Sequence, residues 1–376
     1  MNEWQLNAQR LLRKACTPWG IKASLVELDN YNAIFTRDAV MAGIAGILLE
    51  DEVIIKGLKN TLEQLKIRQG EQGQIASNFT IIDGQPDKVS FGTLSPKIDA
   101  CTWYLMGVAL LLRENKIEKK NFRESIEQTI NLLDALEFNG KHLIYIPKGG
   151  NWADEYVYEG YILYDQVLRA WGLSLLATVF EVPDWAEKAN AIMACISSSY
   201  QNENKPYLDA SFYPGGRFEK FDLAAHALAG ILFDDKQLDL EPVFDWITVH
   251  FMDKKQFPPA FYPVIKPGDS DWESLRNFHL FGFKNSPYHY HNGGIWWIWL
   301  GWLSIALSVR KQEAALLKLT ELAISYLRSL EDFDFKEYIS ADERMPSGTP
   351  KLCYTAAGMV FLSLAKNKAD FSLLKP

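Results

Sequence analysis

The chain has 376 residues, a formal net charge of −8 and an apolar fraction of 48%. Its length alone suggests roughly two to three domains, but no Pro/Ser-rich linker, low-complexity tract or long block of like charge divides it. The negative charge, without a basic cluster, argues against nucleic acid and anionic membrane surfaces as partners. We therefore expect a single domain over residues 1–376 that binds a neutral or cationic small molecule. The sequence indicates no oligomeric state.

The start of the chain lacks the apolar run of a signal peptide, because residues 1–14 carry a polar residue every few positions. The longest apolar stretch, residues 295–309, is shorter than the roughly 20 residues needed to cross a bilayer. A cytoplasmic protein is therefore expected. No cofactor or metal is expected either, although the spacing of His289 and His291 alone does not exclude one. The scattered cysteines predict buried free thiols: Cys16, Cys101, Cys195 and Cys353.

Apolar residues at three- and four-residue spacing predict about twelve helices and hardly a strand. In chain order the expected helices cover residues 4–15, 38–50, 52–68, 98–114, 121–138, 161–180, 183–200, 221–233, 240–252, 293–310, 312–330 and 352–366. Two short stretches, residues 75–82 and 142–146, favour strands in a small hairpin or loop.

The expected helices form pairs. A helix rich in small and aromatic residues, such as residues 39–49, is followed by one with a charged face, such as residues 51–66. The first member of such a pair is buried on all sides and the second covers it. Repeated hairpins of this kind build an open solenoid or a closed toroid, and the absence of a solenoid consensus favours closure. We expect an all-α toroid of about six hairpins with short β-hairpins or loops at one end.

Two acids stand where early helices begin. Asp38 follows Arg37, and Asp99 precedes Trp103 by one helical turn. Either acid alone is explained by the helix dipole, which favours a carboxylate in the first turn. The neighbouring Arg37 and Trp103 favour a binding site, because residues four apart share one helical face.

The segment around Asp154 is aromatic. Trp152 and Tyr156 flank it, and such surroundings would desolvate the carboxyl group and raise its pKa, as a general acid near neutral pH requires. Glu155 is the alternative acid, and a surface loop with two adjacent acids is the structural alternative. Gln166, in the next expected helix, could reach a substrate hydroxyl.

Residues 288–302 combine a polar, glycine-containing loop with the start of an apolar helix that holds four tryptophans. His291 and Asn292 would present hydrogen-bonding groups at the helix N-terminus. Trp296 would offer a flat apolar surface to the C–H face of a sugar. In the alternative interpretation the tryptophans belong only to the core.

Glu337 lies in a charged segment that, taken alone, is better explained as a structural surface loop. Together with Asp154 it supplies the two carboxyl groups that glycoside cleavage needs. The two residues are so far apart in sequence that only a closed fold could bring them together.

At these residues the chain resembles the neutral/alkaline invertases, from about residue 30 to residue 365. The shared motifs occur in the same order: Asn30-Tyr31 through Phe35-x-Arg37-Asp38, Pro96-x-x-Asp99-x-x-x-Trp103, the Asp154 segment followed by Gly160-Tyr161 and Gln166, Tyr290-His291-Asn292-Gly293-Gly294-x-Trp296, and Glu337-Tyr338 before Tyr354-x-Ala-x-Gly358. The invertases are six-hairpin, (α/α)6-barrel glycoside hydrolases, and the wider group includes glycogen-debranching glucosidases and processing α-glucosidases.

The resemblance implies inverting hydrolysis of sucrose or a related small α-glucoside, with Asp154 as general acid and Glu337 as the base that activates water. It implies a neutral carbohydrate as substrate and these residues around the sugar: Arg37, Asp38, Asp99, Trp103, Gln166, His291, Asn292 and Trp296. We add Trp152 from its position beside Asp154.

The chain departs from the invertases in two places. It has Asp154-Glu155-Tyr156 where they have Asp-Arg-Arg, and Leu163-Tyr164-Asp165-Gln166 where they have Pro-x-Glu-x-Gln. A glycoside is therefore implied more broadly than sucrose. Two alternatives stay open: a sugar epimerase or isomerase that uses His289 or His291 as proton carrier, and a relative that binds sugar without cleaving it.

Overall fold

The computed structural model describes residues 2–26, 31, 33–137 and 140–376. Each expected helix is present within this part of the chain. The helices are α1 (Asn2–Ala15), α2 (Thr36–Leu48), α3 (Glu52–Ile67), α4 (Asp99–Arg113), α5 (Lys119–Ala135), α6 (Leu163–Phe180), α7 (Pro183–Ser199), α8 (Leu223–Leu232), α9 (Glu241–His250), α11 (Trp297–Val309), α12 (Glu313–Ser329) and α13 (Cys353–Lys366). Residue 138, the expected end of α5, lies outside the described residues.

Three short helical segments were not expected: α10 (Trp272–Asn277) and the 3₁₀ helices η2 (Met252–Lys254) and η3 (Ser372–Leu374). All are too short for the helical spacing of apolar residues to emerge from the sequence. A larger difference concerns the start of α11, since the backbone at Trp296 is still extended and the helix begins only at Trp297. His291 and Asn292 therefore lie in the preceding loop, away from the helix N-terminus.

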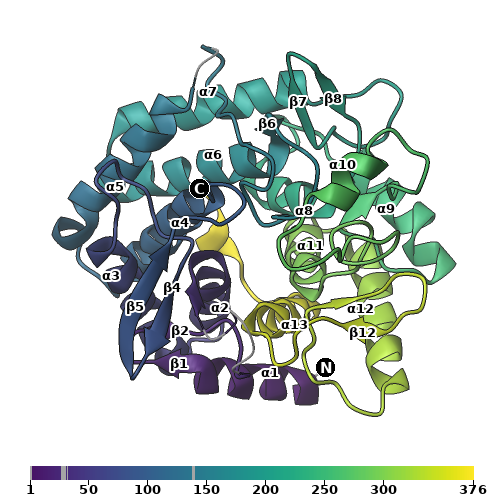
Figure 1. The fold of residues 1–376 in the computed structure, drawn as a ribbon, viewed down its shortest axis with the longest axis horizontal. Helices are drawn as coiled ribbons and strands as arrows, with labels where there is room; N and C mark the ends of the chain where they lie inside the picture. The colour runs from purple at the N-terminus through teal and green to yellow at the C-terminus, as the bar shows by residue number, and fades with distance from the viewer. Residues whose placement is uncertain (1, 27–30, 32, 138–139) are drawn as a thin grey trace.

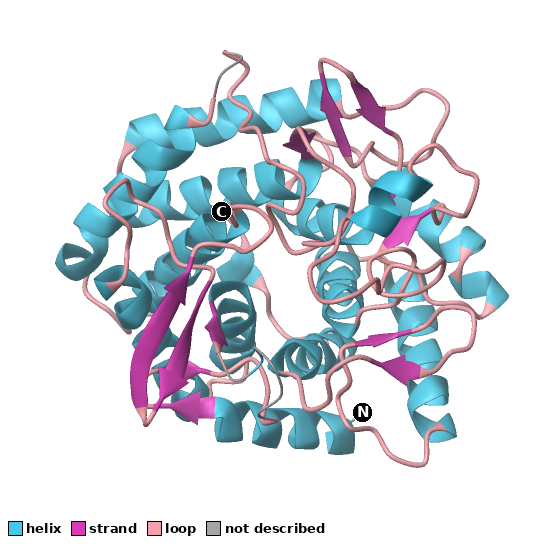
Figure 2. Cartoon of the chain, in the orientation of Figure 1, coloured by secondary structure: helices cyan, strands magenta, loops and turns pink. Residues whose placement is uncertain are grey.

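The strands are short and pair antiparallel in sheets of two or three (Figure 2). They are β1 (Cys16–Thr17), β2 (Gly20–Ile21), β3 (Ile34–Phe35), β4 (Asn78–Ile82), β5 (Gln85–Ser90), β6 (Tyr161–Ile162), β7 (Ser211–Tyr213), β8 (Gly216–Phe218), β9 (Phe221–Asp222), β10 (Phe261–Tyr262), β11 (Tyr338–Ile339) and β12 (Pro346–Ser347). The expected strand at residues 75–82 corresponds to β4. At residues 142–146 the expectation was wrong, since only Ile146 forms a bridge, with Gly160.

Six helices form an inner ring: α2, α4, α6, α8, α11 and α13 (Figure 1). Each contacts the next, and α13 contacts α2, so the circle of contacts is closed. Helices α1, α3, α5, α7, α9 and α12 lie outside this ring. The sequence explains the division, because inner helices such as α4 and α11 are buried on all sides whereas α3 and α5 bury one apolar face.

Small residues let two inner helices approach closely. A Cβ atom on Gly301 of α11 would lie 2.5 Å from the carbonyl oxygen of Gly358 in α13, and one on Gly358 would lie even closer to the carbonyl oxygen of Trp297. Only glycine allows this backbone contact. The aromatic side chains of α11 are consequently packed around a tight crossing between α11 and α13.

The arrangement of the helices also places the polar loops that precede the inner helices. Each inner helix is separated from the next inner helix by a covering helix that runs back, so the N-termini of the inner helices gather at one end. Strands β3, β6 and β9 lead directly into α2, α6 and α8. The loops with the unusual residues are therefore brought to the same end of the ring.

Most of the buried hydrophobic side chains form one cluster, which includes residues from Ala8 to Leu374. Among the described residues, no helix has the length and apolar character needed to span a membrane. All four cysteines are free, as expected, although Cys16 and Cys195 are only half-buried.

Candidate active site

A cavity of about 80 Å³ lies at the end of the ring where α2, α11 and α13 begin. It is lined by Tyr31, Phe35, Arg37, Asp38, Trp152, Asp154, Tyr290, His291, Trp296, Glu337, Leu352 and Tyr354. The fold thus brings Asp154 and Glu337, which are far apart in sequence, to one cavity. Of the predicted substrate-binding residues, the cavity includes Arg37, Asp38, Trp152, His291 and Trp296.

The side chain of Asp154 is 41% exposed, and its Oδ2 atom lies 3.7 Å from Nζ of Lys97. Lys97 is held in place by the carbonyl oxygen of Gly149, at 2.5 Å. Burial raises the pKa of Asp154, but the positive charges of Lys97 and Arg37 and the nearby His291 outweigh it, so the pKa falls below its usual value. The expected rise was wrong because the sequence did not reveal the approach of Lys97.

Glu337 is buried, with an exposed fraction of 7%. The hydroxyl of Tyr31 donates a hydrogen bond to its Oε1 atom at 2.7 Å, and the backbone N–H of Thr349 donates to Oε2 at 3.4 Å. Burial nevertheless raises the pKa of Glu337 to about 7. This carboxyl group can therefore gain or lose a proton near neutral pH.

The backbone beside Glu337 requires glycine. Gly348 has a φ of +80°, a left-handed conformation, and a Cβ atom there would lie 2.5 Å from Oε2 of Glu337. Gly348 thus leaves the space that the carboxylate occupies.

Arg37 is oriented by a chain of buried side chains behind the cavity. Its Nη1 atom donates to Oδ2 of Asp99 at 2.9 Å, the hydroxyl of Tyr164 donates to the same oxygen at 3.5 Å, and the indole N–H of Trp103 donates to Tyr164 at 2.8 Å. Asp99 and Trp103, both predicted to bind sugar, do not line the cavity: Asp99 accepts from Arg37, and Trp103 donates to Tyr164.

Asp38 also approaches this arginine, with its Oδ2 atom 3.8 Å from Nη2 of Arg37. Burial raises the pKa of Asp38 to about 6, although Arg37 lowers it. Asp38 is thus a third carboxyl group in the cavity that titrates between its ordinary range and neutral pH.

Four buried polar atoms of residues that line the cavity have no hydrogen-bond partner among the described residues: Nε of Arg37, Nε1 of Trp152, Nδ1 of His291 and the hydroxyl oxygen of Tyr354. Buried polar groups in folded proteins are nearly always paired, so unpaired groups around one cavity call for an explanation. Hydroxyl groups of a bound polyol would satisfy both donors and acceptors of this kind.

Trp296 and His291 stack, with ring centroids 5.5 Å apart, and Tyr338 stacks on Trp296 at 5.9 Å. The indole N–H of Trp296 donates to the carbonyl oxygen of Tyr290 at 3.0 Å. Burial lowers the pKa of His291 to about 3, so its ring is neutral near neutral pH. The pair forms a rigid aromatic wall of the cavity.

Two predicted residues lie away from the cavity, and their amides are used by the backbone. Gln166 donates to the carbonyl oxygen of Ile144 at 2.9 Å and accepts from its N–H at 3.0 Å. Asn292 does the same with Ile265, at 2.8 Å and 2.7 Å. Both side chains hold loops together, and neither amide is available for a substrate.

Sequence reasoning missed several residues of the site. Four aromatic residues of the shared motifs line the cavity, but no role in sugar binding was predicted for them, because aromatic residues are also common in cores: Tyr31, Phe35, Tyr290 and Tyr354. Their neighbours in the first motif, Asn30 and Asn32, lie outside the described residues. Lys97 carried no signal apart from its place two positions before Asp99.

The described residues contain no group of three or more His, Cys, Asp or Glu side chains arranged to hold a metal ion. His289, which the sequence left open as a ligand, has its Nε2 atom 3.5 Å from Oδ1 of Asp342 and does not line the cavity.

No family model matches the chain, and no curated protein matches it. Its fold is similar to that of solved glycosidases. A glycosidase variant in complex with glucose superposes with a TM-score of 0.68 and 13% identity, over 98% of this chain and 97% of that chain. A GH63 mannosylglycerate hydrolase from Thermus thermophilus, also in complex with glucose, gives a TM-score of 0.65 and 11% identity, over 96% and 99%.

These similarities define the class of fold: a helix-rich glycosidase fold with small sheets. The expected relation to the invertases in particular stays a prediction.

Proposed function

We propose that the chain is a glycoside hydrolase, built as a single (α/α)6-barrel domain over residues 1–376, with Asp154 and Glu337 as its catalytic pair. The closed ring of inner helices and the fold shared with glycosidases support the architecture. The observation that supports the activity is that three carboxyl groups, those of Asp154, Glu337 and Asp38, and four unpaired polar atoms surround one small cavity.

In the proposed reaction, Glu337 takes a proton from a water molecule as the water oxygen attacks the anomeric carbon. The bond from that carbon to the leaving oxygen breaks, and Asp154 gives its proton to the leaving oxygen. Attack from the opposite face inverts the anomeric configuration, which requires carboxyl groups roughly 6.5–9.5 Å apart. A pKa of about 7 suits Glu337 as a base near neutral pH.

The sugar is held by the residues that surround this pair. Arg37, Asp38, Trp152 and His291 provide hydrogen-bonding groups, and Trp296 provides an apolar surface. Sucrose or a related small α-glucoside is the proposed substrate, because the motifs around the cavity resemble those of the invertases and two similar structures hold glucose.

One observation favours a second version of the same mechanism with the roles exchanged. The pKa of Asp154 lies below its usual value whereas burial raises the pKa of Glu337 to about 7, so in the free protein Glu337 holds the proton more tightly. Glu337 would then be the acid and Asp154 the base. The two versions predict a different pH dependence for the rate of the Asp154→Asn variant.

The histidine mechanism of an epimerase is less well supported. With a pKa of about 3, His291 is a poor proton carrier near neutral pH, and His289 does not line the cavity. A protein that only binds sugar would have the same cavity, so only turnover separates it from a hydrolase.

The test measures the hydrolysis of sucrose, maltose, trehalose and aryl α-glucosides by the release of sugar. It is carried out on the wild type and on the variants Asp154→Asn and Glu337→Gln. We expect each variant to lose about 10² to 10⁴ of the rate while it still binds glucose. Glu343→Gln, an exposed acid near the same segment, is the matched control and should retain full activity. Calorimetric binding of glucose without hydrolysis of any substrate would instead identify a sugar-binding protein.

A further inference from the structure

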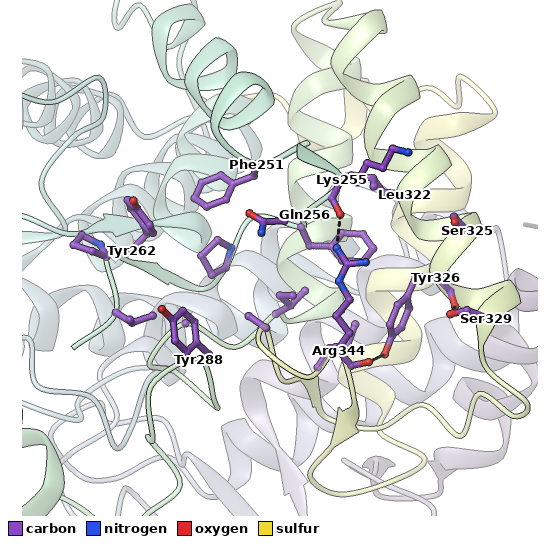
Figure 3. Close-up of a pocket in the computed structure, with 18 of the residues that line it drawn as sticks. Phe251, Lys255, Gln256, Tyr262, Tyr288, Leu322, Ser325, Tyr326, Ser329 and Arg344 are labelled. Atoms are coloured by element: carbon purple, nitrogen blue, oxygen red, sulfur yellow. Dashed lines mark hydrogen bonds between the residues drawn. The ribbon is translucent and has the colours of Figure 1, made fainter. Parts of the chain in front are cut away.

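A second cavity, of about 520 Å³, lies apart from the candidate active site. Its walls come from the segment around η2 and β10, from α12, and from the residues that follow β11 (Figure 3). The volume falls within the range of roughly 300–1,000 Å³ that small-molecule sites occupy. None of the predicted catalytic or sugar-binding residues lines it.

The two cavities lie on opposite sides of one backbone ladder. Ile295 and Ile339 exchange both backbone hydrogen bonds, at 2.9 Å and 2.8 Å, and both residues line the second cavity. Trp296, the next residue after Ile295, lines the candidate active site. Because successive side chains of an extended segment point to opposite sides, the second cavity is a separate pocket.

The charge of the second cavity is opposite to that of the whole chain. Lys255, Lys266 and Arg344 line it, and none of the described residues that line it is acidic, although the chain has a net charge of −8. Nζ of Lys266 lies 5.8 Å from the ring centroid of Tyr288, which is also part of the wall. An anionic ligand is the complementary partner for this surface.

Two hydrogen bonds hold Arg344 in place, one to its side chain and one to its backbone. Its Nη2 atom donates to the carbonyl oxygen of Lys255 at 2.6 Å, and its own carbonyl oxygen accepts from the hydroxyl of Tyr326 at 3.1 Å (Figure 3). A guanidinium group has five N–H donors in a planar fork that suits phosphate and carboxylate groups. The bond to Lys255 uses one donor and orients the rest.

The remaining wall is largely apolar and aromatic. Phe251, Phe257 and Leu322 line it together with Tyr262 and Tyr288. Such a wall favours a ligand with a flat or apolar body beside its charged group.

We propose that this cavity binds a small amphipathic anion, with a phosphate or carboxylate group at Arg344 and Lys266 and a flat apolar body against the aromatic wall. The proposal stands on this cavity alone and does not depend on the proposed hydrolase activity. Phosphate and carboxylate share the chemistry that the cavity recognises, and the experiment distinguishes them.

The probes are 1-naphthyl phosphate and 1-naphthoate, titrated calorimetrically into the full chain, with the neutral 1-naphthalenemethanol as reference. We expect at least one anion to bind saturably and more tightly than the neutral compound, and the tighter anion identifies the group. Saturating glucose should leave this binding unchanged. Equal binding of the neutral compound, no binding of either anion at millimolar concentration, or displacement by glucose would each overturn the proposal.

Two variants test whether the anion binds in the second cavity. Arg344→Gln should weaken anion binding about 10-fold or more, the scale of a lost hydrogen bond to a charged group. Lys254→Gln is the matched control, because Lys254 is exposed in η2, carries the same charge and does not line the cavity. Ser325→Trp on α12 should abolish binding by filling the cavity while the circular dichroism spectrum stays that of the wild type. Unchanged binding in both Arg344→Gln and Ser325→Trp would place the anion elsewhere and contradict the proposal.

Discussion

The hydroxyl of Tyr31 donates a hydrogen bond of 2.7 Å to Oε1 of Glu337, so the two residues lie together although they come from the first and last parts of the chain. The bond lowers the pKa of Glu337, whereas burial raises it to about 7. Glu337 and Asp154 share the cavity, and the charge of Asp154 also raises the pKa of Glu337. Above the lowered pKa of Asp154 and below about pH 7, the pair therefore carries one proton.

The wild-type rate should depend on that proton under either assignment of roles. We expect kcat/KM to fall as pH rises through about 7, because the shared proton is then lost from the pair. A profile measured between pH 4 and pH 9 on a cleaved α-glucoside checks this. A rate that keeps rising above pH 8 would show that this pair does not control catalysis.

Asp154→Asn separates the two assignments of roles on α-glucosyl fluoride, whose leaving group needs no proton. If Glu337 is the base, the residual rate should rise with pH through the pKa of Glu337, and that pKa should be lower than in the wild type because the negative charge of Asp154 is gone. If Glu337 is the acid, the residual rate on this substrate should not rise with pH, because the leaving group does not need the proton of Glu337 and the base has been removed. The measurement is kcat/KM of the variant against pH.

Gly348→Ala should misplace Glu337. The added methyl group would lie 2.5 Å from Oε2 of Glu337, and a displacement of about 1 Å can cost on the order of 10²-fold in rate. Gly84→Ala is the control, since Gly84 has a similar φ of +74° but no atom within 4 Å of the added methyl group. Equal loss of activity in both variants would mean that backbone strain, rather than contact with Glu337, is responsible.

Asp222→Asn should stabilise the protein at alkaline pH. Asp222 is fully buried, its Oδ1 atom caps α8 by accepting from the N–H of Ala225, and burial raises its pKa to about 7. A carboxyl group whose pKa is higher in the folded than in the unfolded chain contributes stability below the unfolded pKa, and that stability is lost as pH rises through about 7. Asparagine keeps the cap without the buried charge.

At pH 8 we expect Asp222→Asn to raise the free energy of unfolding by about 1 to 3 kcal/mol relative to the wild type, and to change it little at pH 4. Urea unfolding at both pH values checks this. Asp239→Asn is the control, because Asp239 is an exposed acid whose Oδ1 atom accepts from the N–H of Glu241 at the start of α9. If the free energy of unfolding at pH 8 rises no more in Asp222→Asn than in Asp239→Asn, burial of the Asp222 charge is not the cause.

Trp296→Ala should weaken binding of glucose by about 1 to 3 kcal/mol, the scale of a lost buried aromatic contact. Because His291 and Tyr338 also stack on this ring, the variant should be destabilised as well, so Trp296→Phe is measured beside it. Trp302→Phe is the core control, since Trp302 is buried away from the cavity. Calorimetry that finds the same affinity in the wild type and in folded Trp296→Ala would assign this tryptophan to the core.

The helices could be predicted because the inner and covering helices differ so clearly in composition. Helix α4 is apolar on every side, and α5 alternates apolar and charged residues at helical spacing. The strands of two or three residues and the short helix α10 could not be predicted, because segments of this length depend on contacts with distant parts of the chain and are too short to show a periodicity.

The candidate site was predicted where residue type and position agree, as for Arg37 and Glu337. The prediction was wrong where contacts between distant parts of the chain determine what a side chain binds. Nothing in the local sequence indicates that the amides of Gln166 and Asn292 bond to the backbone of Ile144 and Ile265, or that Lys97 approaches Asp154 and lowers its pKa. The roles proposed for the cavity residues stay predictions.

The most direct test of the proposed function is the anomeric configuration of the first sugar released from an α-glucoside, followed by proton NMR before mutarotation. We predict that the β-anomer appears first with the wild type, as inversion by Asp154 and Glu337 requires, and that neither Asp154→Asn nor Glu337→Gln releases it at a comparable rate. First release of the α-anomer, or full activity in either variant, would contradict this catalytic pair.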